Sequence, residues 1–122
     1  MEIPGIQVAS CERSFGFSWN MSQEQKAEAA AYYTELFEKA WEMGADRDVL
    51  VLDELCGAVG LGFVPEERVI AALSRKPGHL EVVLTGRNPS QKLLELADYV
   101  TEMKMIKHPY EQGIGAREGI EY

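Results

Sequence analysis

The chain has 122 residues, of which 46% are hydrophobic and 26% are charged, and its net charge is −8. This length and composition are typical of one soluble globular domain, and so acidic a chain is a poor candidate for binding duplex nucleic acid. No apolar run approaches the ~20 residues that a membrane span needs, and the first ten residues do not resemble a signal peptide. We therefore expect a cytoplasmic protein that binds neither membranes nor nucleic acid.

The first part of the chain predicts a short strand followed by an aromatic segment. Residues 5–11, "GIQVASC", have the composition of a short strand. Phe15, Phe17 and Trp19 follow at a spacing of two. In an extended segment this spacing places Phe17 and Trp19 on one face.

A long helix and a buried strand are predicted next. Ser22 and Gln25 form a capping-box signature, apolar residues then recur at helical spacing, and Gly44 is a natural stop. Residues 48–54, "DVLVLDE", begin with an unbroken apolar run. Such a run is typical of a central strand in a covered parallel sheet.

The rest of the chain alternates helices with strands, which predicts βαβ units and an α/β fold with a mainly parallel sheet of about four strands flanked by helices. For the fourth helix, Asn88 is the expected cap and Pro89 the expected first residue. The expected elements are a short helix and turn at 55–64, a helix at 65–78, a strand at 80–86, a helix at 88–98, a strand at 99–103 and an irregular tail at 104–122.

Two carboxylates, Asp53 and Glu54, end the buried strand. Open α/β sheets bind ligands at this carboxyl edge, and Mg²⁺ takes carboxylate oxygens together with substrate phosphates. The alternative is that Asp53 caps a helix and Glu54 lies in its first turn. A magnesium strand normally accompanies a glycine-rich phosphate loop ending in Gly-Lys-Ser/Thr, but none of the 11 glycines precedes a lysine. We therefore expect the chain to begin partway through a larger fold.

Thr85, Gly86 and Arg87 follow the next strand and are expected at the same edge of the sheet. Arg87 could bind a phosphate or carboxylate through two parallel hydrogen bonds, or it could be a surface arginine after a turn glycine. His108 precedes a proline, and we expect it to be structural rather than catalytic.

Four stretches in this order resemble the P-loop type of corrinoid adenosyltransferase, from about residue 6 to residue 122. The stretches are "GFSW" (16–19), "VLVLDEL" (49–55), "LTGRNPSQKLLELADYVTEMK" (84–104) and "KHPYEQGIGAREGIEY" (107–122). The resemblance implies a truncated P-loop NTPase (RecA-like) fold. In it, residues 1–122 are a single domain corresponding to the larger C-terminal part of such an enzyme.

The resemblance also implies a function in cobalamin biosynthesis or salvage. Members of this family transfer the adenosyl group of ATP to the cobalt of a corrinoid, use Mg²⁺, work in the cytoplasm and are typically homodimers. Because the chain has no phosphate loop, we expect it to be weak or inactive in isolation. The alternative is a degenerate corrinoid-binding or regulatory module that pairs with a P-loop-containing partner.

The resemblance assigns roles to six residues of this chain. Asp53 and Glu54 would hold Mg²⁺, and Thr85 and Arg87 would bind the nucleotide. Phe17 and Trp19 would be catalytic and corrinoid-binding, because the matching aromatics lie at the lower face of the corrin and displace the axial ligand of Co(II). Axial ligation is a main determinant of the reduction potential of a macrocyclic metal. Ordinary packing of the two rings is the alternative.

Overall fold

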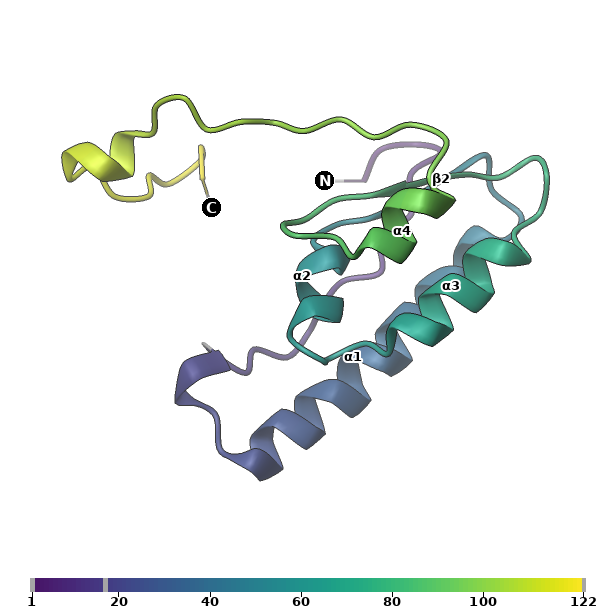
Figure 1. Cartoon of the computed structure of the whole chain (residues 1–122), viewed down its shortest axis with the longest axis horizontal. Coiled ribbons are helices and arrows are strands. Elements are labelled where there is room, and N and C mark those ends of the chain that lie inside the picture. Colours follow the sequence, from purple (N-terminus) through teal and green to yellow (C-terminus); the bar gives the residue numbers. More distant parts are fainter. Residues whose placement is uncertain (1, 17, 122) are drawn as a thin grey trace.

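The computed structural model describes residues 2–16 and 18–121, with only the backbone of Ser18. It is an α/β fold in which helices lie beside a small sheet (Figure 1). Among the described residues, no helix is both long enough and apolar enough to cross a membrane. The elements are η1 (Ser18–Asn20), α1 (Gln23–Gly44), β1 (Val49–Leu52), α2 (Leu55–Gly60), α3 (Glu66–Ser74), β2 (Glu81–Leu84), α4 (Gln91–Leu96) and η2 (Pro109–Gln112).

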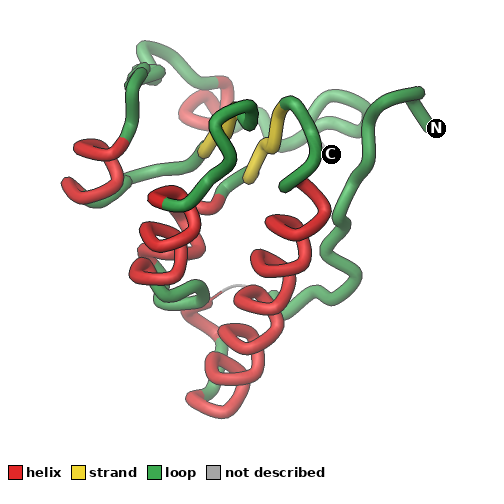
Figure 2. The backbone as a smooth tube through the Cα atoms, turned by 90° about the vertical axis from the view of Figure 1, so that its right-hand side faces the viewer, coloured by secondary structure: helices red, strands yellow, loops and turns green. Residues whose placement is uncertain are grey.

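The sheet consists of two parallel strands, β1 and β2, paired from Val49 with Glu81 to Leu52 with Leu84 (Figure 2). The predicted parallel sheet is confirmed, but the prediction of about four strands is wrong for the described residues. Neither 5–11 nor 99–103 forms a strand. A strand exists only where a neighbour accepts and donates ladder hydrogen bonds, and these two segments have no such neighbour.

The core lies between one face of the sheet and the helices. Phe37 of α1, Leu52 of β1, Val69 of α3 and Leu93 of α4 are buried in one cluster. Burial of these apolar side chains is the main favourable term that holds the elements together. In both views α1 and α3 run side by side beneath the strands (Figures 1 and 2).

The beginning of α1 follows the sequence prediction closely. The Ser22 hydroxyl accepts a hydrogen bond from the Gln25 backbone N–H at 3.2 Å, and the Gln25 side chain accepts one from the Ser22 N–H at 2.9 Å. The predicted capping box and the end of the helix at Gly44 are therefore confirmed.

The start of α4 differs from the prediction. Its cap is Ser90, whose hydroxyl accepts from the Leu93 N–H at 3.2 Å, so the prediction of Asn88 is wrong. Asn88 has a φ of 51° and lies two residues earlier, in the turn that leaves the sheet. A cap residue needs extended backbone angles, which Ser90 has and Asn88 lacks.

The C-terminal segment leaves the core after α4 and ends in η2 and a final turn (Figure 1). The His108 Nδ1 atom accepts a hydrogen bond from the Tyr110 N–H at 3.0 Å and so caps η2. His108 therefore has the expected structural contact. Arg117 pairs with Glu121 at 2.7 Å, and this contact lowers the pKa of the Glu121 carboxyl.

Replacing the cap of α1 should destabilise the fold measurably. We expect Ser22→Ala to lower the free energy of unfolding by about 1 kcal/mol, because it leaves a helix N–H without its acceptor. Urea denaturation followed by circular dichroism measures this change. Gln23→Ala, one position later, is the matched control and should change stability by less than half as much; equal losses would contradict the capping account.

Candidate functional site

A threonine hydroxyl joins the carboxyl ends of the two strands. The Thr85 Oγ1 atom donates a hydrogen bond to the Asp53 Oδ1 atom at 2.8 Å. The same oxygen accepts one from the Glu54 backbone N–H at 2.9 Å. Asp53, Glu54 and Thr85 are thus brought together at one edge of the sheet, as the sequence predicted.

The alternative that Asp53 caps the following helix is wrong. The N-cap position of α2 is Glu54, which has a φ of 56° and makes no side-chain cap bond. The left-handed backbone at Glu54 turns the chain sharply from β1 into α2. Asp53 and Glu54 are both exposed, so their carboxylates face solvent at the end of the strand.

The first turn of α2 packs closely against the end of β2. The Cys56 N–H donates to the Thr85 carbonyl oxygen at 3.2 Å, across from Gly86, whose φ is 135°. A Cβ atom at Gly86 would lie 2.8 Å from the Cβ atom of Cys56 and 3.0 Å from the Gly57 nitrogen. This close approach also buries the Cys56 side chain, and burial raises the pKa of its thiol.

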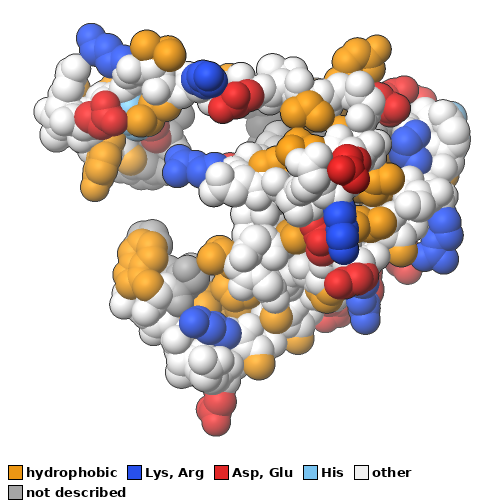
Figure 3. All heavy atoms as spheres, in the orientation of Figure 1, with side chains coloured by type: hydrophobic (Ala, Val, Ile, Leu, Met, Phe, Trp, Pro, Cys, Tyr) orange, Lys and Arg blue, Asp and Glu red, His pale blue; other side chains and the backbone are white. Residues whose placement is uncertain are grey.

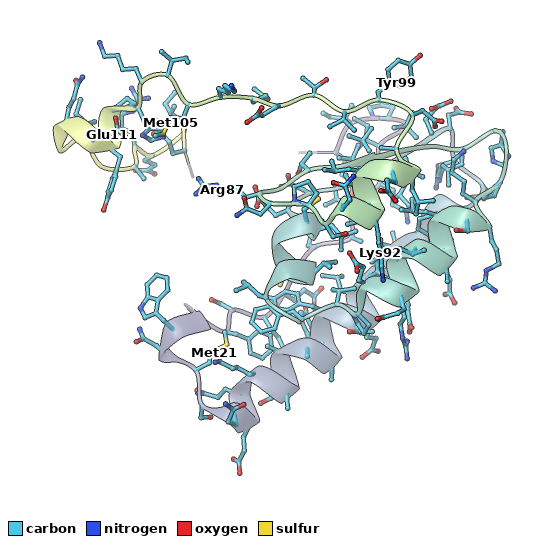
Figure 4. All side chains as sticks on the ribbon, viewed as in Figure 1. Met21, Arg87, Lys92, Tyr99, Met105 and Glu111 are labelled. Atoms are coloured by element: carbon cyan, nitrogen blue, oxygen red, sulfur yellow. The ribbon has the colours of Figure 1, made fainter. Side chains whose placement is uncertain are left out.

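Arg87 follows Gly86 on the same loop and is exposed. It projects from the loop away from the helices and toward the C-terminal segment (Figure 4). A guanidinium in this position is accessible to an anionic ligand at the carboxyl edge. The structure therefore brings four of the six predicted site residues to one place.

The aromatic segment does not have the predicted extended form. Phe17 lies outside the described residues, and Trp19 belongs to the short helix η1, where it is 75% exposed. Gly16, with a φ of 73°, separates these residues from Phe15. Phe15 packs inward against Tyr32 at a ring distance of 5.6 Å. Trp19 therefore does not lie in an extended segment as predicted, and the prediction that it shares a face with Phe17 falls outside the described residues.

The face of the molecule is hollowed between the segment that holds η1 and the C-terminal segment (Figure 3). The loop after β2 projects toward this hollow (Figures 1 and 4). The exposed aromatic turn and the polar carboxyl edge therefore lie on the same side of the molecule.

The carboxyl edge offers a limited set of metal ligands. The described residues contain no group of three or more His, Cys, Asp or Glu side chains placed to hold a metal ion. Mg²⁺ is commonly bound through one or two carboxylates, with substrate phosphates and waters completing its shell. Asp53 and Glu54 fit that limited role. One carboxylate oxygen of Asp53 already accepts a hydrogen bond from Thr85.

The chain was compared with known proteins. The family model of ATP:corrinoid adenosyltransferase BtuR/CobO/CobP matches residues 2–122. The chain belongs to the corrinoid adenosyltransferase family. It is 39% identical over 109 residues to corrinoid adenosyltransferase CobA of Salmonella typhimurium, covering 88% of this chain and 55% of that protein.

Other relatives give the same picture. Corrinoid adenosyltransferase of Escherichia coli K12 is 38% identical over 109 residues, with the same shares covered. That of Pseudomonas aeruginosa is 38% identical over 113 residues, covering 88% of this chain and 53% of that protein. The chain thus spans about half the length of the curated relatives it matches.

Two features of the site could not be read from the sequence. The Thr85 hydroxyl was expected to contact nucleotide, and its hydrogen bonds to the end of β1 depend on strand register. Gly86 was interpreted as a turn glycine, whereas its close approach to α2 depends on how two distant elements pack. The only sequence signal was the Thr-Gly pair after a strand. That pair does not show which residues Thr85 and Gly86 contact in the fold.

Removing the Thr85 hydroxyl should loosen the carboxyl edge. We expect Thr85→Val to lower the free energy of unfolding by about 1–2 kcal/mol, since it removes the acceptor of Glu54 and the donor to Asp53. Hydrogen exchange of the Glu54 amide should become faster. Thr85→Ser keeps the hydroxyl and is the control; exchange as fast in Thr85→Ser as in Thr85→Val would contradict this role.

Adding one methyl group at Gly86 should be more damaging than adding it elsewhere. We expect Gly86→Ala to lower the free energy of unfolding by about 2 kcal/mol or more, because the new Cβ atom meets α2 and the backbone angle is unfavourable for alanine. Gly78→Ala is the matched control, since a Cβ atom there meets nothing within 4 Å. Thermal denaturation of both variants measures the difference, and equal melting temperatures would be the contrary result.

Proposed function

We propose that this chain contributes to the transfer of the adenosyl group of ATP to the cobalt of a corrinoid. Membership of the family supports this, and one structural observation carries it: Asp53, Glu54, Thr85 and Arg87 gather at the carboxyl edge of a parallel sheet. That edge is where open α/β sheets bind ligands. In this proposal residues 1–122 act as one domain, the larger C-terminal part of a P-loop NTPase (RecA-like) assembly in the cytoplasm.

The carboxyl edge is proposed to bind the nucleotide. Asp53 and Glu54 would hold Mg²⁺, which neutralises phosphate charge when bound. Thr85 would orient the Asp53 carboxylate through the bond that it already makes. Arg87 is exposed and cationic, so it can pair with phosphate oxygens in the fork geometry that guanidinium groups favour.

The aromatic turn is proposed to bind the corrinoid. Trp19 is on the short helix η1 and is 75% exposed, so an apolar macrocycle would contact the part of it that faces solvent. Phe17 is proposed to have the same role. An aromatic ring offers no strong ligand to cobalt, so a corrinoid held against it would lose its lower axial ligand and become easier to reduce.

Nucleotide binding by the chain alone should be weak. Backbone N–H groups of a phosphate loop normally bind most of the triphosphate, and none of the 11 glycines of this chain precedes a lysine. We propose that the active form is a homo-oligomer or pairs with a P-loop-containing chain. The same observation favours a second candidate, a corrinoid-binding or regulatory module without transferase activity.

Fluorescence can test corrinoid binding at the aromatic turn directly. The chain has two tryptophans, and Trp41 packs against Phe37 at a ring distance of 6.1 Å, away from the turn. In a Trp41→Phe background the remaining emission comes from Trp19. We expect a Co(II) corrinoid to quench that emission. We also expect the absorption spectrum of the bound corrinoid to shift toward that of the four-coordinate form.

The controls separate the two candidate functions. Trp19→Ala should abolish the spectral shift, whereas Trp19→Phe should keep it. Calorimetry with Mg²⁺ and ATP, compared between the native chain and Arg87→Ala, tests the nucleotide site. Corrinoid binding without ATP binding would favour the second candidate, the corrinoid-binding or regulatory module. If neither the corrinoid nor ATP binds, the proposed function is refuted.

A further inference from the structure

The segment that precedes the aromatic turn, residues 16–20, is fastened to α1 by two side-chain contacts. The Glu12 backbone N–H donates a hydrogen bond to the Tyr32 phenol oxygen at 2.9 Å. The Arg13 guanidinium forms a hydrogen-bonded ion pair with the Glu28 carboxylate. Because Glu28 and Tyr32 are four residues apart on one helix, they lie on the same face of α1. The segment is therefore held against that face before the chain enters the turn.

The Arg13 guanidinium also lies over two aromatic rings. Its central carbon is 4.6 Å from the centroid of the Phe15 ring and 5.7 Å from that of the Tyr32 ring. A guanidinium within about 6 Å of a ring centroid is attracted by the negative face of the ring. Arg13 therefore joins a carboxylate and a tyrosine of α1 to Phe15, the residue directly before the turn.

The rings beneath Arg13 are supported by the core. Phe15 packs against Tyr33 at a ring distance of 5.7 Å, and Tyr33 packs against the buried Phe63 at 5.6 Å. The Thr34 hydroxyl donates a hydrogen bond to the Phe63 carbonyl oxygen at 3.1 Å. None of these contacts involves the guanidinium, so this base should stay in place when the guanidinium is removed.

The ion pair of Arg13 contributes little to folding, because it is exposed to solvent. The Arg13 and Glu28 side chains are 51% and 56% exposed. Ion pairs at this exposure add little to the free energy of unfolding, since water and salt screen the charges. The pair can therefore influence the direction of the neighbouring chain without determining whether the domain folds.

The aromatic turn is fixed at both ends. At its far end, the Ser22 capping box sets the start of α1, and Figure 1 shows η1 close to that start. At its near end, Gly16 has a φ of 73° and redirects the chain between Phe15 and Trp19. Binding residues keep a productive geometry only when neighbouring contacts hold them. The direction in which the chain leaves Phe15 therefore affects where the Trp19 ring lies.

We propose that Arg13, paired with Glu28, is a positioning residue for the corrinoid: it fixes the orientation of the aromatic turn and, with it, of the Trp19 ring. The inference rests on the proposed function and adds a residue to which no sequence motif pointed. Arg13 acts through Phe15 and the backbone of the turn, without contact with substrate. When the guanidinium is removed, the turn samples more orientations, and only a fraction of them binds the macrocycle.

The test compares two substitutions in the Trp41→Phe background, in which Trp19 supplies the emission. Arg13→Met keeps an apolar stem but removes the charge, whereas Arg13→Lys keeps a charge that can pair with Glu28. We expect Arg13→Met to weaken binding of a Co(II) corrinoid about three- to tenfold, and to lower the four-coordinate fraction at saturation by about half. Arg13→Lys should change the affinity by about twofold or less. Melting curves from circular dichroism should show that both variants are folded.

A second ion pair of the same kind provides the matched control. Arg68 of α3 pairs with Glu38 of α1, and these side chains are 56% and 50% exposed. Arg68→Met removes a pair that lies between α1 and α3, so it should leave corrinoid affinity unchanged. The fluorescence anisotropy of Trp19 is measured without corrinoid. It should decay faster in Arg13→Met than in the Trp41→Phe parent, and at the parental rate in Arg68→Met.

Two results would overturn the proposal. One is an anisotropy decay of Trp19 that is the same in Arg13→Met as in the Trp41→Phe parent. The other is a corrinoid affinity that Arg13→Met does not lower, or that Arg68→Met lowers equally. If the parent itself binds no corrinoid, the proposed function fails and this inference fails with it. Because the parent and the Arg13 variants are measured separately, the two failures are distinguishable.

Discussion

The parallel pairing of β1 with β2 is the constraint on which the rest of the structure depends. It sets Asp53 and Thr85 within one hydrogen bond of each other, although they are 32 residues apart in the chain. The same pairing places Gly86 against the first turn of α2, where only a glycine fits. A shift of the register by one residue would direct every side chain to the opposite face and dismantle the carboxyl edge.

The two halves of the candidate site are held in different ways. The carboxyl edge is fixed by the hydrogen bonds between β1 and β2, by the Thr85 hydroxyl and by the close packing of Gly86 against α2. Its polar groups are therefore positioned before any ligand binds. The turn that carries Trp19 is joined to α1 through a capped helix start. Phe15, packed on Tyr32 and Tyr33, fixes the chain just before that turn. In the proposed function, the carboxyl edge would bind the polar nucleotide and the exposed turn would bind the apolar face of the corrinoid.

The sequence predicted those parts of the fold that depend on local signals. The Ser22 capping box, the apolar run of β1 and the alternation of helices with strands all have short-range causes, and each was found. The predictions of strands at 5–11 and 99–103 were wrong because a strand needs a hydrogen-bonded neighbour, which composition does not reveal. Asn88 failed as a cap because the turn out of β2 required its left-handed backbone angles. The Thr85 bridge depended on register, which no single segment specifies.

The uneven charge of the chain affects how the edges of its two-stranded sheet behave in solution. Residues 1–65 carry 11 acidic and 4 basic side chains, while residues 66–122 carry 9 and 8. The half that contains β1 is therefore strongly negative, and copies of the chain repel each other at the surface where unwanted strand pairing would begin. Salt screens such repulsion over a distance of about 8–10 Å at physiological ionic strength. The colloidal stability of the protein should thus depend on ionic strength even where its folding does not.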